Sequence, residues 1–298
     1  MYIVYNPQGR FANNCFQYFA TKVIQKLINE NYRNKFPDYK GDICQFVDVN
    51  SSQRQTLLAT NKWVRVDDNI FINLYNSLKA NLFNNFNSNF YMDGFYQFDF
   101  FMSENLEYIK SLINSENKDS INAKYSISDL YSAFNRYQRN EFTDEDLIVH
   151  IRLDDFVNEG RNSYVMSDKT YFNTIKIIQN KHKFNNIYIV VDKIRRVWEN
   201  QYINSLLLNL KNIGITNISV LPTSDLLTDM TRLYSAKNVL CSNSTFCWIP
   251  VLLGKCEKNW LPNKNTCSNQ RFFKINNHTQ IYPMEYLYMT KEESVELI

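Results

Sequence analysis

A regular alternation of short apolar runs and amphipathic segments between residues 147 and 254 constrains the fold more than any other feature. The apolar runs 147–152, 186–192, 217–221 and 238–244 each have the length of a strand, and segments with helical spacing lie between them. Parallel strands need a long crossover, usually a helix. The alternation therefore predicts a parallel sheet that is covered by helices on both faces, as in a Rossmann-like α/β domain.

The first half of the chain is less regular. Residues 1–6 form a short apolar run that ends at "NPQG", and apolar residues then recur at helical spacing from residue 16 to residue 28. Residues 30–90 are rich in asparagine and aromatic residues, and short helices are expected within 56–66 and 73–83. Further helices are expected at 106–114, 127–138 and, from a capping box, 290–297. The polar stretch "RNEFTDED" predicts a boundary between an acceptor-side domain, 1–142, and a nucleotide-sugar domain, 143–298.

Composition excludes several classes of protein. The 33 basic and 30 acidic residues give a net charge of +3, which is too balanced for a general nucleic-acid binder. The six cysteines form no CxxC pair and there are three histidines, so no dedicated metal site is expected. The start of the chain lacks the pattern of a signal peptide, and no apolar run approaches the ~18 residues of a membrane span. We expect a soluble cytoplasmic protein, and work at a membrane face through a partner stays open.

The candidate site residues follow predicted strands. Ligands of open α/β sheets bind beyond the carboxyl ends of the strands. Arg10 comes after the first predicted strand, and His150 and Arg152 lie at the end of the strand that begins near residue 147. The sequence "SNSTF", with Asn243, Ser244 and Thr245, follows the strand that begins at residue 238. Guanidinium groups, hydroxyls and amides of this kind suit an anionic ligand.

Two features of this set allow two interpretations each. His150 and Arg152 are two residues apart and so share one face of the strand. A buried arginine needs a partner, which is either an acid such as Asp154 or Asp155, or a ligand phosphate held by the guanidinium fork. The Ser244–Thr245 pair at the predicted start of a helix either caps the helix or binds a phosphate there.

Several common catalytic motifs are absent from the sequence. It contains no G-x-x-x-x-G-K-[ST], which disfavours P-loop kinases, and no G-x-G-x-x-G, which disfavours dinucleotide enzymes. It also has no G-x-S-x-G nucleophile elbow.

Four segments together resemble glycosyltransferase family 11, the α-1,2-fucosyltransferases, and more distantly other GDP-fucose-dependent enzymes. "GRFANNCFQYFA" (9–20) is similar to the family's G-x-[LMF]-G-N-Q-x-F-Q-Y-A, and "DGFYQFDFFMSENLEYIKSLI" (93–113) to its G-Y-F-Q segment with the following helix. "VHIRLDDFV" (149–157) resembles V-H-[IV]-R-R-G-D-Y-V, and "DMTRLYSAKNVLCSNSTFCW" (229–248) resembles the acidic helix followed by S-N-S-[ST]-[FY]-S-W. The four segments occur in the family's order and span most of the chain.

The resemblance implies a GT-B fold, with two Rossmann-like α/β domains that face a cleft, and an inverting transfer of fucose from GDP-fucose to a glycan hydroxyl, the 2-hydroxyl of galactose. The transfer would need no metal or other cofactor. The resemblance implies a catalytic group of Arg152, His150 and Asp155. Arg152 would bind the β-phosphate, His150 would shape the pocket and Asp155 matches the family's aspartate at the strand-end loop. It also implies donor contacts from Arg10, Asn13, Arg152, Asn243, Ser244 and Thr245.

The chain departs from the family's pattern at the end of its third motif. The family's second arginine is Leu153 here, and its glycine is Asp154. The first change removes a positive charge that is expected next to the phosphates, and the second adds a negative one. Two alternatives therefore stay open: a GT-B transferase that uses another nucleotide sugar, and a member that binds nucleotide or glycan without transfer. The general base is also open, with Asp154, Asp155, Glu159, Asp168 and His150 as candidates.

Overall fold

The structure, a computed structural model, divides the chain into two compact units, Met1–Ser132 and Ala133–Ile298. It describes residues 1–114, 117–136, 142–153, 165–222, 224–262, 279–283 and 285. The boundary expected from the sequence, after residue 142, lies further along the chain than this division, within the second unit. The helix expected at 290–297 lies outside the described residues. Each unit is considered by itself.

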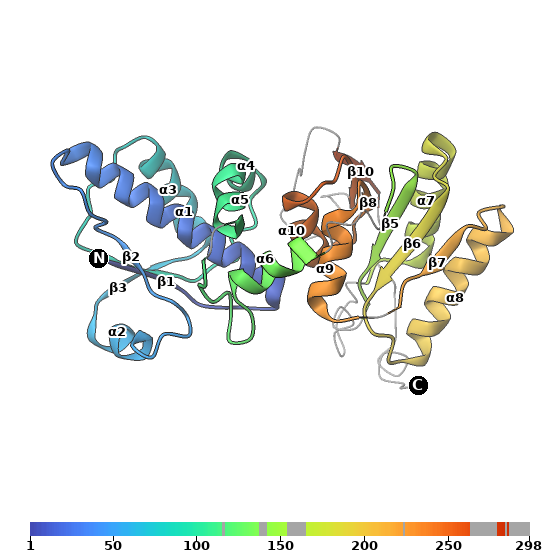
Figure 1. The fold of residues 1–298 in the computed structure, drawn as a ribbon, viewed down its shortest axis with the longest axis horizontal. Helices are drawn as coiled ribbons and strands as arrows, with labels where there is room; N and C mark the ends of the chain where they lie inside the picture. Colours follow the sequence, from blue (N-terminus) through green and yellow to red (C-terminus); the bar gives the residue numbers. More distant parts are fainter. Residues whose placement is uncertain are drawn as a thin grey trace. The chain divides into compact units, whose positions relative to one another are not determined.

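The N-terminal unit is built on a parallel sheet in the order β2-β1-β4-β3. Its strands are β1 (Tyr2–Tyr5), β2 (Gln45–Phe46), β3 (Trp63–Val66) and β4 (Asn89–Met92). Its helices are α1 (Phe11–Lys35), α2 (Arg54–Thr60), α3 (Asp68–Lys79), α4 (Asp99–Glu104), α5 (Leu106–Asn114) and α6 (Ile127–Arg136), which crosses the division. Crossovers between parallel strands are right-handed. The units β1-α1-β2 and β3-α3-β4 run in the same direction across the sheet, so α1 and α3 lie on one face. The unit β2-α2-β3 runs in the other direction and places α2 on the opposite face (Figure 1).

The irregular region of the sequence is where the expectations needed correction. The first strand and the helices expected at 106–114 and 127–138 are confirmed as β1, α5 and α6. The short helix expected within 56–66 is present as α2, which ends at Thr60, but the rest of the segment, "WVRV", forms a strand, β3. Tryptophan and valine favour a strand, and pairing with β4 satisfies its backbone. The helix expected within 73–83 begins earlier, because the carboxylate of Asp67 caps the amides of Asn69 and Ile70.

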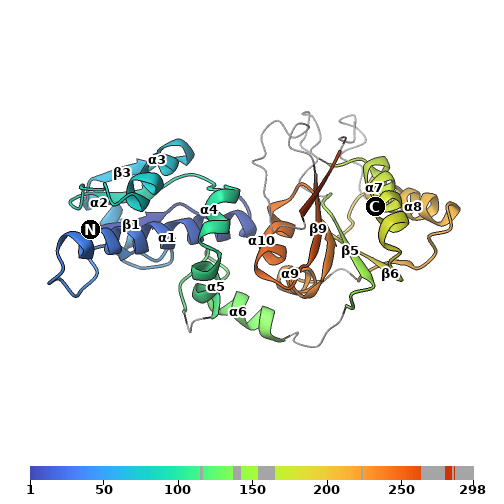
Figure 2. The same cartoon turned by 90° about the horizontal axis from the view of Figure 1, so that it is seen from above.

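The C-terminal unit has a parallel sheet in the order β10-β9-β8-β5-β6-β7. Its strands are β5 (Asp146–Ile151), β6 (Asn186–Val191), β7 (Ile218–Val220), β8 (Asn238–Leu240), β9 (Lys258–Pro262) and β10 (Thr279–Tyr282). Its helices are α7 (Asp168–His182), α8 (Val197–Asn212), α9 (Leu226–Ser235) and α10 (Thr245–Leu253). The predicted alternation is confirmed, and the strand order is that of the doubly wound Rossmann fold. The helices α7 and α8 cover one face, and α9 and α10 cover the other (Figure 2).

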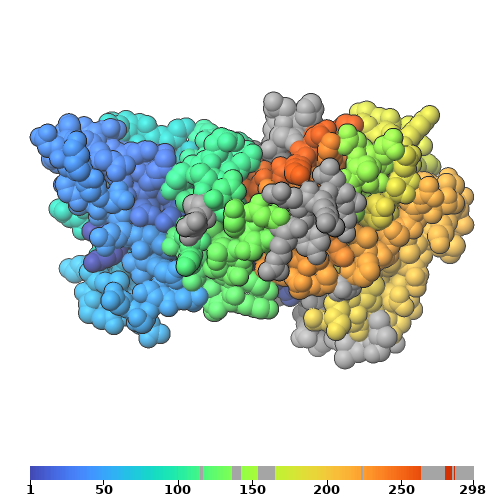
Figure 3. Space-filling view, in the orientation of Figure 1, coloured from blue at the N-terminus to red at the C-terminus, as the bar shows by residue number. Residues whose placement is uncertain are grey.

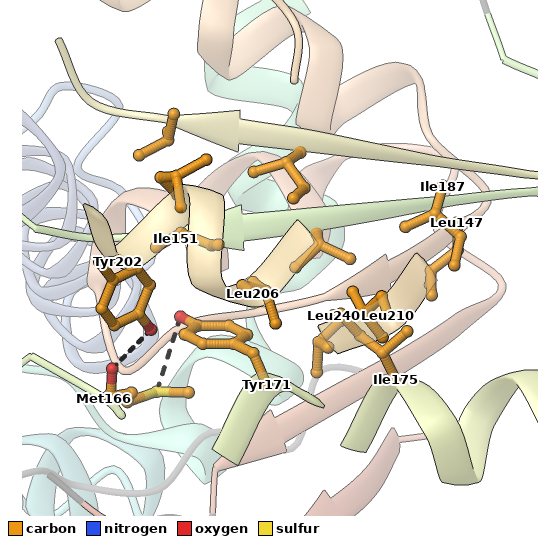
Figure 4. Close-up of a cluster of buried hydrophobic side chains, with 14 of the residues drawn as sticks. Leu147, Ile151, Met166, Tyr171, Ile175, Ile187, Tyr202, Leu206, Leu210 and Leu240 are labelled. Atoms are coloured by element: carbon orange, nitrogen blue, oxygen red, sulfur yellow. Dashed lines mark hydrogen bonds between the residues drawn. The ribbon is translucent and has the colours of Figure 1, made fainter. Parts of the chain in front are cut away.

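The two faces of β5 have different surroundings. Leu147, Val149, Ile151 and Leu153 point into a hydrophobic cluster with α7 and α8. Figure 4 shows part of this cluster, in which the hydroxyl of Tyr202 donates to the main-chain oxygen of Met166 at 2.7 Å. Because side chains alternate along a strand, His150 and Arg152 point to the other face, toward α9 and α10. The packing of Leu147, Val149 and Ile151 in this cluster fixes the register, since a slip of one residue would turn His150 and Arg152 into the apolar cluster instead.

Candidate functional site

The predicted site residues of the C-terminal unit meet where the strand order of its sheet reverses. The strands β5 and β8 are neighbours, and Val149 is opposite Leu240, but their crossover helices lie on opposite faces of the sheet. Loops after such a pair diverge and leave room for a ligand. His150 and Arg152 come from the end of β5, and residues 242–245 come directly after β8. The sheet therefore brings together residues that are about 90 positions apart in the sequence.

Arg152 is held by an aspartate that the sequence reasoning did not single out. Its Nη1 atom lies 2.6 Å from Oδ1 of Asp192, and the two side chains are 8% and 19% exposed. The other carboxylate oxygen of Asp192 accepts from the amide of Leu153 at 3.3 Å. One acid from the end of β6 thus fixes both the guanidinium and the backbone after β5. Asp154 and Asp155, the acids suggested by the sequence, lie outside the described residues.

His150 is buried beside this ion pair. Its Nδ1 atom is 2.8 Å from the hydroxyl oxygen of Ser242, and its ring stacks on Phe246 at a centroid distance of 5.5 Å. Burial, with a smaller contribution from the charge of Arg152, lowers the pKa of His150 to about 3. The imidazole is therefore neutral at physiological pH. A neutral ring in this position orients its neighbours, and it lacks the acidic proton of an imidazolium that could be given to a leaving group.

The loop between β8 and α10 caps the helix, and the first helical residue, Thr245, is accessible. The hydroxyl of Ser244 accepts from the amide of Phe246, and that of Ser242 accepts from the amide of Ser244. Ser242, Asn243 and Ser244 are buried, whereas Thr245 is partly exposed. The capping interpretation of Ser244 is therefore confirmed. The positive end of the α10 dipole lies at the same sheet edge as Arg152, so the edge suits an anion.

The structure places Leu153 away from the candidate site. Its side chain is 1% exposed and belongs to the cluster beneath α7 and α8, on the face opposite His150 and Arg152. The expectation that this position stands next to the phosphates is wrong for this chain. Leucine at 153 contributes to the core, and no positive charge is lost from the face that carries Arg152.

Arg10 and Asn13 belong to the corresponding edge of the N-terminal unit, where β1 and β4 are neighbours. Arg10 is exposed and precedes α1, and the side-chain oxygen of Asn13 accepts from Gln97 Nε2 at 3.0 Å. Gly9, just before them, has a φ of +71°, and a Cβ there would stand 2.4 Å from Asn13 Nδ2. This backbone requires glycine.

Asp192 begins a basic stretch, "DKIRR", that the sequence reasoning also passed over. Lys193 and Arg195 are exposed, and Arg196 is partly buried against Glu199. The signal was present in the sequence, because this stretch directly follows the strand predicted at 186–192. A search of strand ends for acid–base pairs as well as for isolated arginines would have found it.

Two further observations concern the described part of the chain. It contains no group of three or more histidine, cysteine, aspartate or glutamate side chains placed to hold a metal ion. The helices within it are too short or too polar to cross a bilayer.

The comparisons with known proteins give only distant likenesses. No family model matches the sequence, and no curated protein matches it significantly. Among solved structures, the E. coli heptosyltransferase WaaC with ADP is 12% identical over 99% of this chain and 96% of its own, with a TM-score of 0.44. POFUT1 in complex with GDP is 11% identical over 84% of this chain and 94% of its own, with a TM-score of 0.37. Likeness at this level establishes no shared activity, and membership of glycosyltransferase family 11 stays a prediction from the four motifs.

Proposed function

We propose that this protein is an inverting, metal-independent glycosyltransferase that moves fucose from GDP-fucose to a glycan hydroxyl, the 2-hydroxyl of galactose by family resemblance. The observation that carries the proposal is the way the four family-like segments meet. In the C-terminal unit, His150 of the third segment contacts Ser242 and Phe246 of the fourth. In the N-terminal unit, the first and second segments are joined by the bond from Gln17 Nε2 to the main-chain oxygen of Gly94, at 3.1 Å.

Such pairing supports the proposal because it joins segments that lie far apart in the sequence. Segments that share only a coding bias have no reason to converge at the two edges where open α/β sheets bind ligands. In the C-terminal unit, the convergence brings an arginine and a helix N-terminus to one point. Both groups favour negative charge, as a diphosphate requires.

The mechanism follows from the charges at this edge. Transfer breaks the bond between fucose C1 and the β-phosphate oxygen, and negative charge grows on the departing GDP. Arg152 meets this charge with its guanidinium fork, and Asp192 holds it in position. The N-terminus of α10 adds partial positive charge. His150, which is neutral, keeps Ser242 and Phe246 in place. The acceptor hydroxyl attacks C1 from the side opposite to GDP and gives its proton to water or to one of the candidate bases named from the sequence.

A thermal-shift screen of the full chain with GDP, UDP, TDP and CMP tests the proposal. A ligand that binds only the native state raises the unfolding temperature by mass action. We expect a shift with GDP that is larger than the shift with each of the other nucleotides. A shift with UDP and none with GDP would overturn the fucosyltransferase assignment in favour of another donor. GDP binding without release of GDP from GDP-fucose, over a panel of galactose-terminated acceptors, would indicate a binding protein instead of an enzyme.

A further inference from the structure

One arginine of the N-terminal unit has a guanidinium that no carboxylate contacts within the described residues. Arg54 is the first residue of α2, and its Nη2 atom donates to the main-chain oxygen of Tyr5, at the carboxyl end of β1, at 3.3 Å. It forms no ion pair in this part of the chain, and its Nε atom is buried without a hydrogen-bond partner.

The nearby acids are already bound to other groups. The carboxylate of Asp48 accepts from the amides of Asn50 and Ser120, at 2.8 and 2.7 Å. The carboxylate of Asp93 accepts from Arg65 Nε at 2.7 Å and also from Asn6 and Gln8. Arg65 and Asp93 therefore balance each other. Asp48 keeps its charge but forms no ion pair with Arg54, so no carboxylate of the described residues contacts the guanidinium of Arg54.

Arg54 borders a partly open face of the sheet. Tyr91 is opposite both Val4 and Arg65 in the strand pairing, so these three side chains share a face with Tyr2 and Trp63. We call Tyr2, Trp63, Arg65 and Tyr91, together with Arg54, the α2-side face. Trp63 Nε1 donates to the main-chain oxygen of Leu57, which places α2 on this side.

Parallel sheets are normally covered on both faces, but this side is only thinly covered. The helix α2 has no buried residue, and Tyr2, Trp63 and Tyr91 each keep part of their surface exposed. The space-filling view shows α2 and its neighbouring segments, in light blue, on the surface of the unit (Figure 3). Arg54 donates to the main-chain oxygen of Tyr5, which is opposite Met92 in the strand pairing, so Arg54 lies at the carboxyl end of the strand pair that carries Tyr91.

We propose that the α2-side face binds an acceptor saccharide that carries one carboxylate, as a uronic acid does. Arg54 takes the carboxylate through its guanidinium fork, and the exposed rings pack against the apolar face of the sugar. A monoanion fits a single guanidinium that no carboxylate contacts, whereas a phosphate dianion would add a second negative charge near Asp48 and Asp93. The acceptor role rests on the proposed function, but the binding of an acidic sugar does not.

Binding of monosaccharides to the full-length protein tests this proposal without requiring transfer. Methyl β-D-glucuronide, methyl β-D-glucoside and glucose 6-phosphate are titrated separately and followed by ligand-observed NMR. We expect the glucuronide to bind about tenfold more tightly than the glucoside, the factor that corresponds to one charge-assisted contact. We expect the phosphate sugar to bind more weakly than the glucuronide.

Variants identify the residue responsible. Arg54→Gln, which can still donate to Tyr5, should reduce the preference for glucuronide to about twofold or less, and Arg54→Lys should keep part of it. Arg33→Gln is the matched control, because Arg33 pairs with Asp42 near the end of α1 and is not part of the α2-side face. The GDP thermal shift of every variant should equal that of the wild type, which separates this test from that of the donor site.

Equal affinity for glucuronide and glucoside, or a preference that survives in Arg54→Gln, would overturn the proposal. Tighter binding of glucose 6-phosphate would overturn the assignment to a carboxylate. If the wild type binds glucuronide through Arg54 but shows no thermal shift with GDP, the acidic-sugar site stands and the proposed GDP-fucose donor is wrong.

Discussion

The two sheets carry the same kind of ion pair at their carboxyl ends, in different surroundings. In the C-terminal unit Arg152 and Asp192 are 2.6 Å apart, with side chains that are 8% and 19% exposed. In the N-terminal unit Arg65 and Asp93 are 2.7 Å apart, but the arginine is 72% exposed. The distance barely differs between the pairs, so burial is what distinguishes them.

Burial changes what each pair can do. An exposed pair is screened by water and typically contributes 0–1 kcal/mol. A buried pair pays for desolvation, but the field of its charges is strong because little water screens it. Arg152 is therefore already fixed and partly dehydrated before an anion arrives, which is the arrangement that stabilises developing charge in a transition state. Arg65 has no such arrangement, and the predictions below test this contrast.

Replacement of Arg152 by alanine should have the largest effect. We expect kcat/KM for transfer from GDP-fucose to fall by about 10²-fold or more, the scale of losing one oriented electrostatic contact. Arg152→Lys should also be poor, because a point charge cannot replace the fork. Steady-state kinetics gives the ratio, and circular dichroism checks that the variants are folded. Near-normal transfer by folded Arg152→Ala would remove this residue from the mechanism.

The buried histidine makes the stability of the C-terminal unit depend on pH. The pKa of His150 is about 3 in the folded protein and ordinarily near 6.5, so between these values the unfolded chain binds the additional proton. Stability is therefore lost as the pH falls below 6.5, by about 2 kcal/mol between pH 6.5 and 5. Urea unfolding of wild type and His150→Gln at each pH measures this.

The variant provides the control for the other titrating groups. The difference in unfolding free energy between wild type and His150→Gln should shift steadily in favour of the variant as the pH falls. A difference that stays constant from pH 7 to pH 5 would mean that His150 is protonated in the folded state, and that its surroundings are wetter than the contacts with Ser242 and Phe246 indicate.

Asp192 should act by positioning Arg152, with a smaller effect. We expect Asp192→Ala to lower kcat by about tenfold, a loss that corresponds to about 1.4 kcal/mol. Asp192→Asn should retain more activity, because its amide oxygen can still accept from Arg152. GDP should bind both variants at least as tightly as the wild type, because a negative charge near the phosphates is gone. Isothermal titration measures this, and weaker GDP binding that parallels the loss of kcat would contradict a positioning role.

The sequence predicted the C-terminal unit well because one signal, hydrophobic periodicity, determines it. Strands with both faces buried read as apolar runs, and helices such as α7 begin at recognisable caps such as Ser167. His150 and Arg152 could be placed on one face by alternation alone. The same alternation places Leu153 in the core, but comparison with the family's arginine suggested otherwise.

What the sequence did not reveal depends on pairing between distant segments. Nothing near Trp63 indicates that "WVRV" will pair with β4, because β-propensity depends on the neighbouring strand. Asp192 is 40 residues from Arg152, and only the register of β5 with β6 brings them together. That no carboxylate of the described residues contacts Arg54 is likewise invisible in the sequence, since it depends on where the nearby acids lie in the fold.

Removal of the exposed pair Arg65–Asp93 should have the smallest effect. A large effect would contradict the contrast between the exposed pair and the buried pair most directly. Arg65→Gln removes a guanidinium that is mostly in water, so we expect the free energy of unfolding to fall by less than about 1 kcal/mol and kcat/KM with a neutral acceptor to change less than about threefold. Urea unfolding at low and high salt measures the first quantity, and added salt should shrink it further. Lys26→Gln, which disrupts an exposed i,i+4 pair with Glu30, supplies the matched surface control. A loss of 2 kcal/mol or more that salt does not change would show that Arg65 is held as tightly as Arg152. Exposure of the side chain would then not distinguish the two ion pairs.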